Sequence, residues 1–302
     1  MTIPGTFITV RANGLEFEVL EAGEGDRLAL CLHGFPEHAL SWRNQIPLLV
    51  SLGYRVWAPN QRGYGNSPRP RDVAAYDMSN LLDDVTALID ASGAKSVTLI
   101  GHDWGAAVCW FYAMRQPRPL ERLIIMNVPH PAPFSKALRT FKQARRSWYM
   151  GFFQLPRLPE FLLSRRHAYA IGQVFLKSAC NPGRFTPDVI AVYRDQAARP
   201  GALTGMLNWY RAAPAGMRKQ MRAGVPRIEI PTLMIWGEED AALGKETTYG
   251  TDRYVANLRL HYLPGVSHWV QQDAPDRVNE LLEAWLAEPL DASPPEPRAQ
   301  AT

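Results

Sequence analysis

The chain has 302 residues, of which 46% are hydrophobic, and its formal net charge is +4 at pH 7. This composition predicts a globular protein with a sizeable core, either one large α/β domain or two small ones. The longest apolar runs are too short to span a membrane, and the first residues have neither a basic region nor an apolar signal core. We therefore expect a cytoplasmic protein without a membrane span.

The cysteines and the charges do not favour a metal ion, a disulfide or nucleic acid. Cys31, Cys109 and Cys180 lie in apolar stretches without metal-ligand spacing, so we expect reduced packing thiols. Residues 130–170 contain eight Lys or Arg and one acid, Glu160. Such a segment can attract anions or nucleic acid, but a solvated helix face is commoner, and no nucleic-acid motif accompanies it.

The N-terminal part of the chain alternates short strands with turns and helices. Residues 7–10 and 15–20 are joined at Asn13-Gly14, which predicts a β-hairpin because both turn residues tolerate positive φ. Residues 28–33 are continuously apolar, as expected of a central strand that is covered on both faces. The next expected elements are a helix over 42–52 that ends at Gly53, a strand over 54–59, and a helix that Ser79 caps and Gly93 ends.

Residues 97–105 read Val-Thr-Leu-Ile-Gly-His-Asp-Trp-Gly, an apolar run that leads into a helix. Gly101 and Gly105 leave room for a sharp turn, which lifts the side chain of Asp103 clear of the sheet. A carboxylate is a poor catalyst of acyl transfer, but it can displace a leaving group from saturated carbon and form an alkyl ester. Asp103 therefore indicates epoxides or alkyl halides as substrates. On this motif alone, a helix cap is an equally good interpretation.

The second half of the chain interrupts the sheet and then resumes it. Residues 123–126 predict another buried strand, and the alternation of strands with helices implies a mostly parallel sheet. Residues 129–225 show no strand and are rich in aromatic residues and prolines, so we interpret them as an inserted helical cap. The remaining expected elements are strands over 231–237 and 258–263 and a helix over 276–286.

These elements predict four segments. A first part of the sheet domain covers residues 1–128, a helical cap covers 129–228, and a second part of the sheet domain covers 229–290. The tail, residues 291–302, is rich in proline and is expected to be disordered.

Candidate catalytic residues follow three different strands. Because loops at the carboxyl ends of parallel strands converge, Asp103, Asp240 and His268 are expected together, in the order nucleophile, acid, base. Glu238 and Glu239 compete with Asp240 as the acid. His268 would activate water to hydrolyse an ester on Asp103, and two backbone N–H groups, of Phe35 and Trp104, would stabilise the oxyanion.

The chain resembles the α/β-hydrolases, and more narrowly the epoxide hydrolases. The matching segments are His33-Gly-Phe-Pro, Gly101-His-Asp-Trp-Gly, Ile235-Trp-Gly-Glu-Glu-Asp and Gly265-Val-Ser-His-Trp, together with Ser147-Trp-Tyr-Met and Asn208-Trp-Tyr-Arg in the cap. The resemblance favours Asp240 as the acid and implies that Tyr149 and Tyr210 hold the epoxide oxygen. For the first of these tyrosines, neighbouring aromatic residues offer alternative registers.

The resemblance also implies a fold and a substrate class. The fold is the α/β-hydrolase fold, a mostly parallel central sheet flanked by helices with an inserted helical cap. The expected substrates are a hydrophobic epoxide and water, and no cofactor and no metal is expected. The expected role is detoxification. Whether the protein forms a homodimer is left open. The side chains expected to line the substrate pocket are His33, Pro36, Trp104, Phe152, Phe153, Trp209 and Trp269. Asn60 stands where relatives commonly have Asp, and we expect it to change loop hydrogen bonds only.

Two other functions compete with epoxide hydrolysis. A haloalkane dehalogenase would use the same Asp nucleophile, but it needs halide donors. Phe35 removes one such donor, whereas Trp148 and Trp209 keep this alternative open. A binding protein of the hydrolase fold without activity ranks lower, because every catalytic position is kept.

Overall fold

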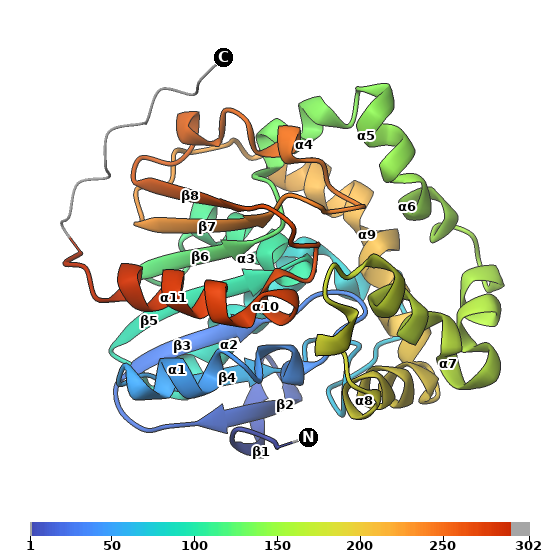
Figure 1. Cartoon of the computed structure of the whole chain (residues 1–302), viewed down its shortest axis with the longest axis horizontal. Coiled ribbons are helices and arrows are strands. Elements are labelled where there is room, and N and C mark those ends of the chain that lie inside the picture. The colour runs from blue at the N-terminus through green and yellow to red at the C-terminus, as the bar shows by residue number, and fades with distance from the viewer. Residues whose placement is uncertain (1, 291–302) are drawn as a thin grey trace.

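The computed structural model describes residues 2–290 (Figure 1). Its centre is an eight-stranded sheet in the order β1-β2-β4-β3-β5-β6-β7-β8. Strands β3 to β8 are parallel, and the first two are antiparallel. The strands are β1 (Thr6–Ala12), β2 (Leu15–Ala22), β3 (Arg27–Leu32), β4 (Arg55–Pro59), β5 (Ser96–His102), β6 (Arg122–Met126), β7 (Thr232–Gly237) and β8 (Leu258–Leu263).

Helices lie between the strands along the chain and after the last strand. They are α1 (Ile46–Ser51), α2 (Met78–Ser92), α3 (Trp104–Arg115), α4 (Pro131–Ala137), α5 (Phe141–Arg146), α6 (Trp148–Phe152), α7 (Leu158–Ser178), α8 (Pro187–Ala198), α9 (Ala202–Arg222), α10 (Val270–Asp273) and α11 (Pro275–Leu286). The predicted class, a mostly parallel sheet flanked by helices, is confirmed.

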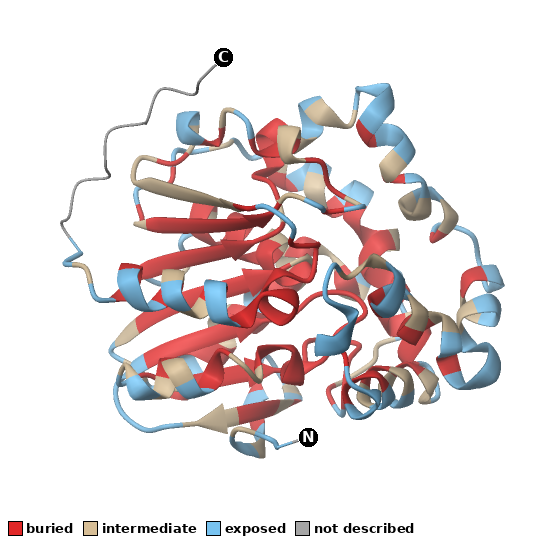
Figure 2. Cartoon of the chain, viewed as in Figure 1, coloured by how far each residue is buried: buried red, intermediate tan, exposed pale blue. Residues whose placement is uncertain are grey.

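Successive residues of each central strand belong to two different cores. In β3, Leu28, Leu30 and Leu32 pack into the core that α2 and α3 complete, whereas Ala29 and Cys31 pack into the core under α1 and α11. This follows from the two-residue period of a strand, since both faces of the sheet are covered. Figure 1 shows one helix layer on each face, and Figure 2 shows the central strands between them, β3 to β7, as largely buried.

The predicted N-terminal hairpin is confirmed. Ala12 pairs with Leu15 across the two-residue turn. Both turn residues have positive φ, 51° at Asn13 and 69° at Gly14, as the Asn-Gly pair predicts.

The prediction of a helix over residues 42–52 is wrong for the first half of that range. Residues Ala39–Trp42 form a short 3₁₀ helix, and α1 begins only at Ile46. Pro47 lies in the first turn of α1, where a missing N–H costs no hydrogen bond. In the interior of a longer helix, the same residue would remove one hydrogen bond and clash with the preceding turn.

Two polar side chains differ from the sequence prediction. Asp77, rather than Ser79, caps α2, because its side chain accepts a hydrogen bond of 2.9 Å from the Ser79 N–H. Cys31 and Cys109 are buried as expected, but Cys180 is exposed. It lies in an irregular segment just beyond the end of α7, where the apolar sequence around it no longer faces the core.

Helices α4–α9, which we call the cap helices, are inserted between β6 and β7. Figure 1 shows them beside the ends at which the parallel strands finish. The expected helical character of this stretch is confirmed, whereas the domain boundaries after residues 128 and 228 stay a prediction. Helix α7 is broken where Arg166, His167 and Ala168 have positive φ.

Within residues 2–290, none of the helices combines the length and the hydropathy that crossing a bilayer requires. The tail for which we predict disorder, 291–302, lies outside the described residues.

Candidate active site

Asp103 occupies the sharp turn between β5 and α3. Its backbone has φ 48° and ψ −123°, a combination that is unfavourable for a residue with a side chain. The turn requires glycine on both sides. A Cβ on Gly101 would come within 2.7 Å of the Ala106 backbone, and one on Gly105 would overlap the Leu32 carbonyl oxygen. The predicted elbow is therefore confirmed in its geometry.

The loop after β3 closes over Asp103. The Phe35 N–H donates a hydrogen bond of 2.6 Å to Asp103 Oδ1. Gly34 lies so close that a Cβ there would overlap the Asp103 side chain. The Trp104 N–H is the first of α3, and the first N–H groups of a helix have no partner within it. The Phe35 N–H thus lies beside the Asp103 carboxylate, and the Trp104 N–H belongs to the next residue of the chain, at the start of α3.

His268 and Asp240 come together beside Asp103. Nδ1 of His268 lies 2.6 Å from Asp240 Oδ2, and Nε2 lies 3.5 Å from Asp103 Oδ2. Of the two carboxylates that compete with Asp240, that of Glu238 pairs with Lys245. Glu239 is exposed. Of the three acids after β7, Asp240 is the one that contacts the histidine.

The Asp103 carboxylate and the His268 imidazole shift the pKa of one another. Burial raises the pKa of Asp103, but the hydrogen bond and the positive charge of His268 outweigh it, so the net pKa lies below its ordinary value. Burial lowers the pKa of His268, but the charge of Asp240 and the hydrogen bond to Asp103 hold it well above its ordinary value. These two shifts favour a protonated His268 beside an ionised Asp103.

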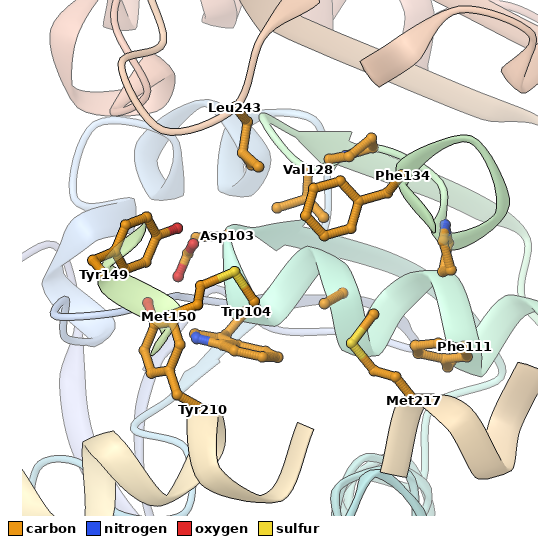
Figure 3. A pocket seen from close by; sticks show the side chains of 13 residues that line it. Asp103, Trp104, Phe111, Val128, Phe134, Tyr149, Met150, Tyr210, Met217 and Leu243 are labelled. Carbon is orange, nitrogen blue, oxygen red and sulfur yellow. The ribbon is translucent and has the colours of Figure 1, made fainter. Parts of the chain in front are cut away.

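Tyr149 on α6 and Tyr210 on α9 face Asp103 from the cap helices. Their ring centroids lie 6.0 Å apart, and the Tyr210 ring packs edge-on against Trp104 at 5.0 Å. Figure 3 shows both phenol groups directed toward the space in front of Asp103. Burial raises the pKa of both phenols, and the charge of Asp103 raises it further. Both groups are therefore neutral hydrogen-bond donors at physiological pH.

A cavity of about 570 Å³, which includes space open to solvent, begins at these groups. It extends along α3, where Asp103, Trp104, Ala107 and Phe111 follow at helical spacing (Figure 3). Apart from Asp103, Trp104 and the two tyrosines, its lining is apolar. These remaining residues are Ala107, Phe111, Val128, Pro129, Pro131, Phe134, Met150, Met217 and Leu243.

The structure corrects the predicted lining of the pocket. Of the seven side chains expected there, only Trp104 lines this cavity. Trp209 is buried and donates from its indole to the Arg62 carbonyl, and Trp269 donates to Ser178. The other four, His33, Pro36, Phe152 and Phe153, do not belong to the lining of this cavity. Sequence proximity to the motifs did not reveal which face of each loop or helix would meet the cavity.

Asn127 was not anticipated as a site residue. Its amide donates a hydrogen bond of 2.9 Å to Asp240 Oδ2, and its carbonyl oxygen accepts one from the Gly237 N–H. Its backbone φ is 46°, at the end of β6. The position directly after a parallel strand is the signal that would have identified it.

Glu37 and His102 form a second group that the sequence reading missed. His102 lies between Glu37 Oε2 and the backbone carbonyl of His268, at 2.8 Å from each. Glu37 also accepts hydrogen bonds from the Gly34 N–H and from Gln272. This fully buried pair therefore links the loop after β3 to the loop that carries His268. His102 lies inside the motif Gly101-His-Asp-Trp-Gly, and Glu37 directly follows the motif His33-Gly-Phe-Pro.

The loop around Asn60 carries hydrogen bonds but no catalytic side chain. Asn60 accepts from the Ala39 N–H and donates to Glu18. His33 is buried, and its Nε2 accepts from the Gln61 N–H. Across residues 2–290 there is no cluster of three or more His, Cys, Asp or Glu side chains that could hold a metal ion.

Comparisons with known proteins agree with this geometry. A family model described as alpha/beta hydrolase fold matches residues 30–171. The AB hydrolase superfamily protein YfhM of Bacillus subtilis is 39% identical over 280 residues, which cover 92% of this chain and 96% of that protein. Epoxide hydrolase 4 of Mus musculus is 38% identical over 289 residues, which cover 93% of this chain and 79% of that protein.

Solved structures give the same result. The structure of the epoxide hydrolase of Bacillus megaterium in complex with an inhibitor is similar to this chain, with a TM-score of 0.84 and 30% identity. The match covers 93% of this chain and 100% of that chain. Epoxide hydrolase A of Mycobacterium thermoresistibile gives a TM-score of 0.82 at 31% identity and covers 93% and 98% of the two chains. The chain therefore belongs to the epoxide hydrolase family of the alpha/beta hydrolase fold.

Proposed function

We propose that this protein hydrolyses apolar epoxides to vicinal diols through an alkyl ester on Asp103. One observation carries the proposal: a carboxylate nucleophile, a histidine held by Asp240, and two phenol donors converge at the end of one apolar cavity. The family relationship supports the same reaction.

Ring opening is the first step. Because Oδ1 of Asp103 is held by the Phe35 N–H, Oδ2 is the oxygen that attacks an epoxide carbon. A bond forms between Oδ2 and that carbon while the ring C–O bond breaks. Tyr149 and Tyr210 donate hydrogen bonds to the leaving oxygen, and one of them transfers its proton to the alkoxide.

Ester hydrolysis is the second step. Esterification removes the charge of Asp103, which is one of the causes that keep the pKa of His268 high, so the imidazolium can pass its proton through solvent to the phenolate that ring opening leaves on a tyrosine. The neutral ring then accepts a proton from water, and the resulting hydroxide attacks Cγ of Asp103. The N–H groups of Phe35 and Trp104 stabilise the oxyanion until its collapse breaks the bond between Cγ and the ester oxygen. The diol oxygen takes the proton of the new carboxyl group, so the Asp103 carboxylate, the neutral tyrosine and the imidazolium are all restored.

The competing dehalogenase reaction lacks a second halide donor at this site. Trp209 already donates its indole N–H to Arg62, and Trp148 is 67% exposed and lies outside the cavity lining. Incubation of the purified protein with styrene oxide and with 1-bromobutane tests the proposal. We expect phenylethanediol from the first and no bromide from the second. Bromide release without diol would replace the proposal by dehalogenation.

Replacing Tyr210 with phenylalanine is expected to slow ring opening by about 10²-fold, because one of two proton donors is lost. The ring packing against Trp104 and Phe35 would persist, since only the hydroxyl is removed. Rapid-mixing measurement of ester formation checks this. Tyr169→Phe, at an exposed position of α7, is the matched control and should keep the wild-type rate. An unchanged rate in Tyr210→Phe would exclude this tyrosine as a donor.

The shape of the cavity predicts an epoxide with one long apolar arm. From Asp103 to Phe111 the cavity follows α3 for about 12 Å. Ala107 lines it midway, so Ala107→Leu should lower kcat/KM for 1,2-epoxydecane by about tenfold or more. Propylene oxide, which needs only the Asp103 end, should be turned over as before. An equal loss for both substrates would show that the arm does not lie along α3.

The pH dependence should differ between the two steps. Ester hydrolysis needs neutral His268, whereas ring opening needs ionised Asp103, whose pKa is lowered, and neutral tyrosines, whose pKa values are raised. As the pH falls below the pKa of His268 in the ester, hydrolysis should slow by about tenfold per pH unit. The ester should therefore accumulate in the wild-type protein under acidic conditions. Acid quenching and mass spectrometry measure its fraction, and a fraction that does not change between pH 8 and pH 5.5 would contradict His268 as the base.

A further inference from the structure

Large apolar side chains are exposed mainly on one part of the molecule. Of the thirteen that are exposed among residues 2–290, nine lie between positions 141 and 176. Phe141 is 84% exposed, Trp148 67% and Phe161 59%. They belong to α5, α6 and the first part of α7, which form the outer rim of the cap in Figure 1 and are largely exposed in Figure 2. We call residues 139–166, which hold six of these nine side chains, the outer cap surface. Exposed apolar side chains that gather on one part of a protein are typical of an interaction site.

The charge of the outer cap surface has one sign. It contains seven basic residues, of which six are exposed: Arg139, Lys142, Arg145, Arg157, Arg165 and Arg166. Its one acid, Glu160, is held by Arg211 at 2.7 Å. Aromatic and aliphatic side chains among basic ones are the composition that binds the interface of an anionic bilayer.

The outer cap surface is also one wall of the cavity. Helix α6 has five residues, yet Trp148 faces solvent whereas Tyr149 and Met150 line the cavity. A ligand on the outside of α6 would therefore lie one helix away from the catalytic group. If the proposed function holds, the substrate is apolar and concentrates in lipid, so this position would favour its transfer to Asp103.

We propose that the outer cap surface docks onto anionic lipid bilayers as a peripheral membrane-binding face. A second copy of the chain fits this surface less well, because a symmetric contact would bring two sets of arginines together. A bilayer that contains phosphatidylglycerol offers both negative charge and an apolar layer.

Co-sedimentation with vesicles tests the proposal. The full-length protein should bind vesicles of 70% phosphatidylcholine and 30% phosphatidylglycerol at least tenfold more tightly than pure phosphatidylcholine vesicles. Binding should weaken in 0.5 M salt, because salt screens the charges. Arg145→Glu with Arg165→Glu should lower the binding by more than tenfold, and Phe141→Ser with Phe161→Ser should lower it by at least fivefold.

Matched controls lie away from the cap. Lys95→Glu, next to β5, changes the charge by the same amount as either single arginine substitution. Ile3→Ser removes an exposed apolar side chain near the N-terminus. Neither should alter binding. All variants are exposed, so thermal melting should show the wild-type transition.

The outcomes separate the alternatives. The proposal would be overturned if the protein bound neither kind of vesicle, or if the control variants lost as much binding as the cap variants. It would also be overturned if the protein formed a dimer that only the cap variants dissociate. Vesicle binding does not depend on turnover, so a protein without epoxide hydrolysis that still sediments with the vesicles would contradict the proposed function and leave this inference standing.

Discussion

Replacing Asp103 with alanine is expected to abolish diol formation, with a loss of at least about 10⁴-fold in kcat. The carboxylate is the group that forms the covalent bond in the proposed reaction, and among residues 2–290 no other carboxylate lines the cavity. Removing it also leaves His268 with Asp240 as its remaining charged neighbour. Chromatographic measurement of the diol from styrene oxide checks the loss.

The matched control for this variant is Glu239→Ala. Glu239 precedes Asp240, is exposed, and should be dispensable, so its variant should keep wild-type activity. Thermal melting of both variants tests whether the fold is kept. Residual diol formation above about 1% of the wild-type rate in Asp103→Ala would mean that another group, or direct attack by water, opens the ring.

Replacing His268 with glutamine is expected to stop the reaction halfway. Ring opening needs Asp103 and the tyrosines, whereas hydrolysis of the ester needs the base, so the ester should accumulate to nearly one equivalent. Turnover should fall by at least about 10³-fold, since general-base catalysis is lost. The intact protein should gain the mass of one styrene oxide, and peptide mapping should place it on Asp103.

The double variant Asp103→Ala with His268→Gln is the control for the site of attachment and should gain no mass. An adduct from 1-bromobutane in place of styrene oxide would favour the dehalogenase reaction. A protein that gains no mass from either reagent, while it binds apolar ligands in the cavity, would support the non-catalytic alternative.

The sequence determined the succession of the strands along the chain, the elbow and the identity of the central residues. These features are local: the Asn13-Gly14 hairpin needs positive φ at two residues, and the turn at Asp103 needs small neighbours at Gly101 and Gly105. The rule that loops converge at the carboxyl ends of parallel strands then predicted that His268 and one acid among residues 238–240 would lie beside Asp103, and the family resemblance favoured Asp240.

Tertiary structure alone decided which faces of the loops and helices meet one another. The spacing of aromatic residues on α9 did not show that Tyr210 would face the cavity while Trp209 would bond to Arg62. The resemblance favoured Asp240 over Glu238, and the contacts give the physical reason, because Lys245 pairs with the Glu238 carboxylate and His268 with that of Asp240. Such contacts join segments far apart in the chain, and a local pattern cannot encode which partner a side chain will find. The sequence therefore specified the residues and their order, and the packing of the cap helices against the sheet decided which of them share the cavity.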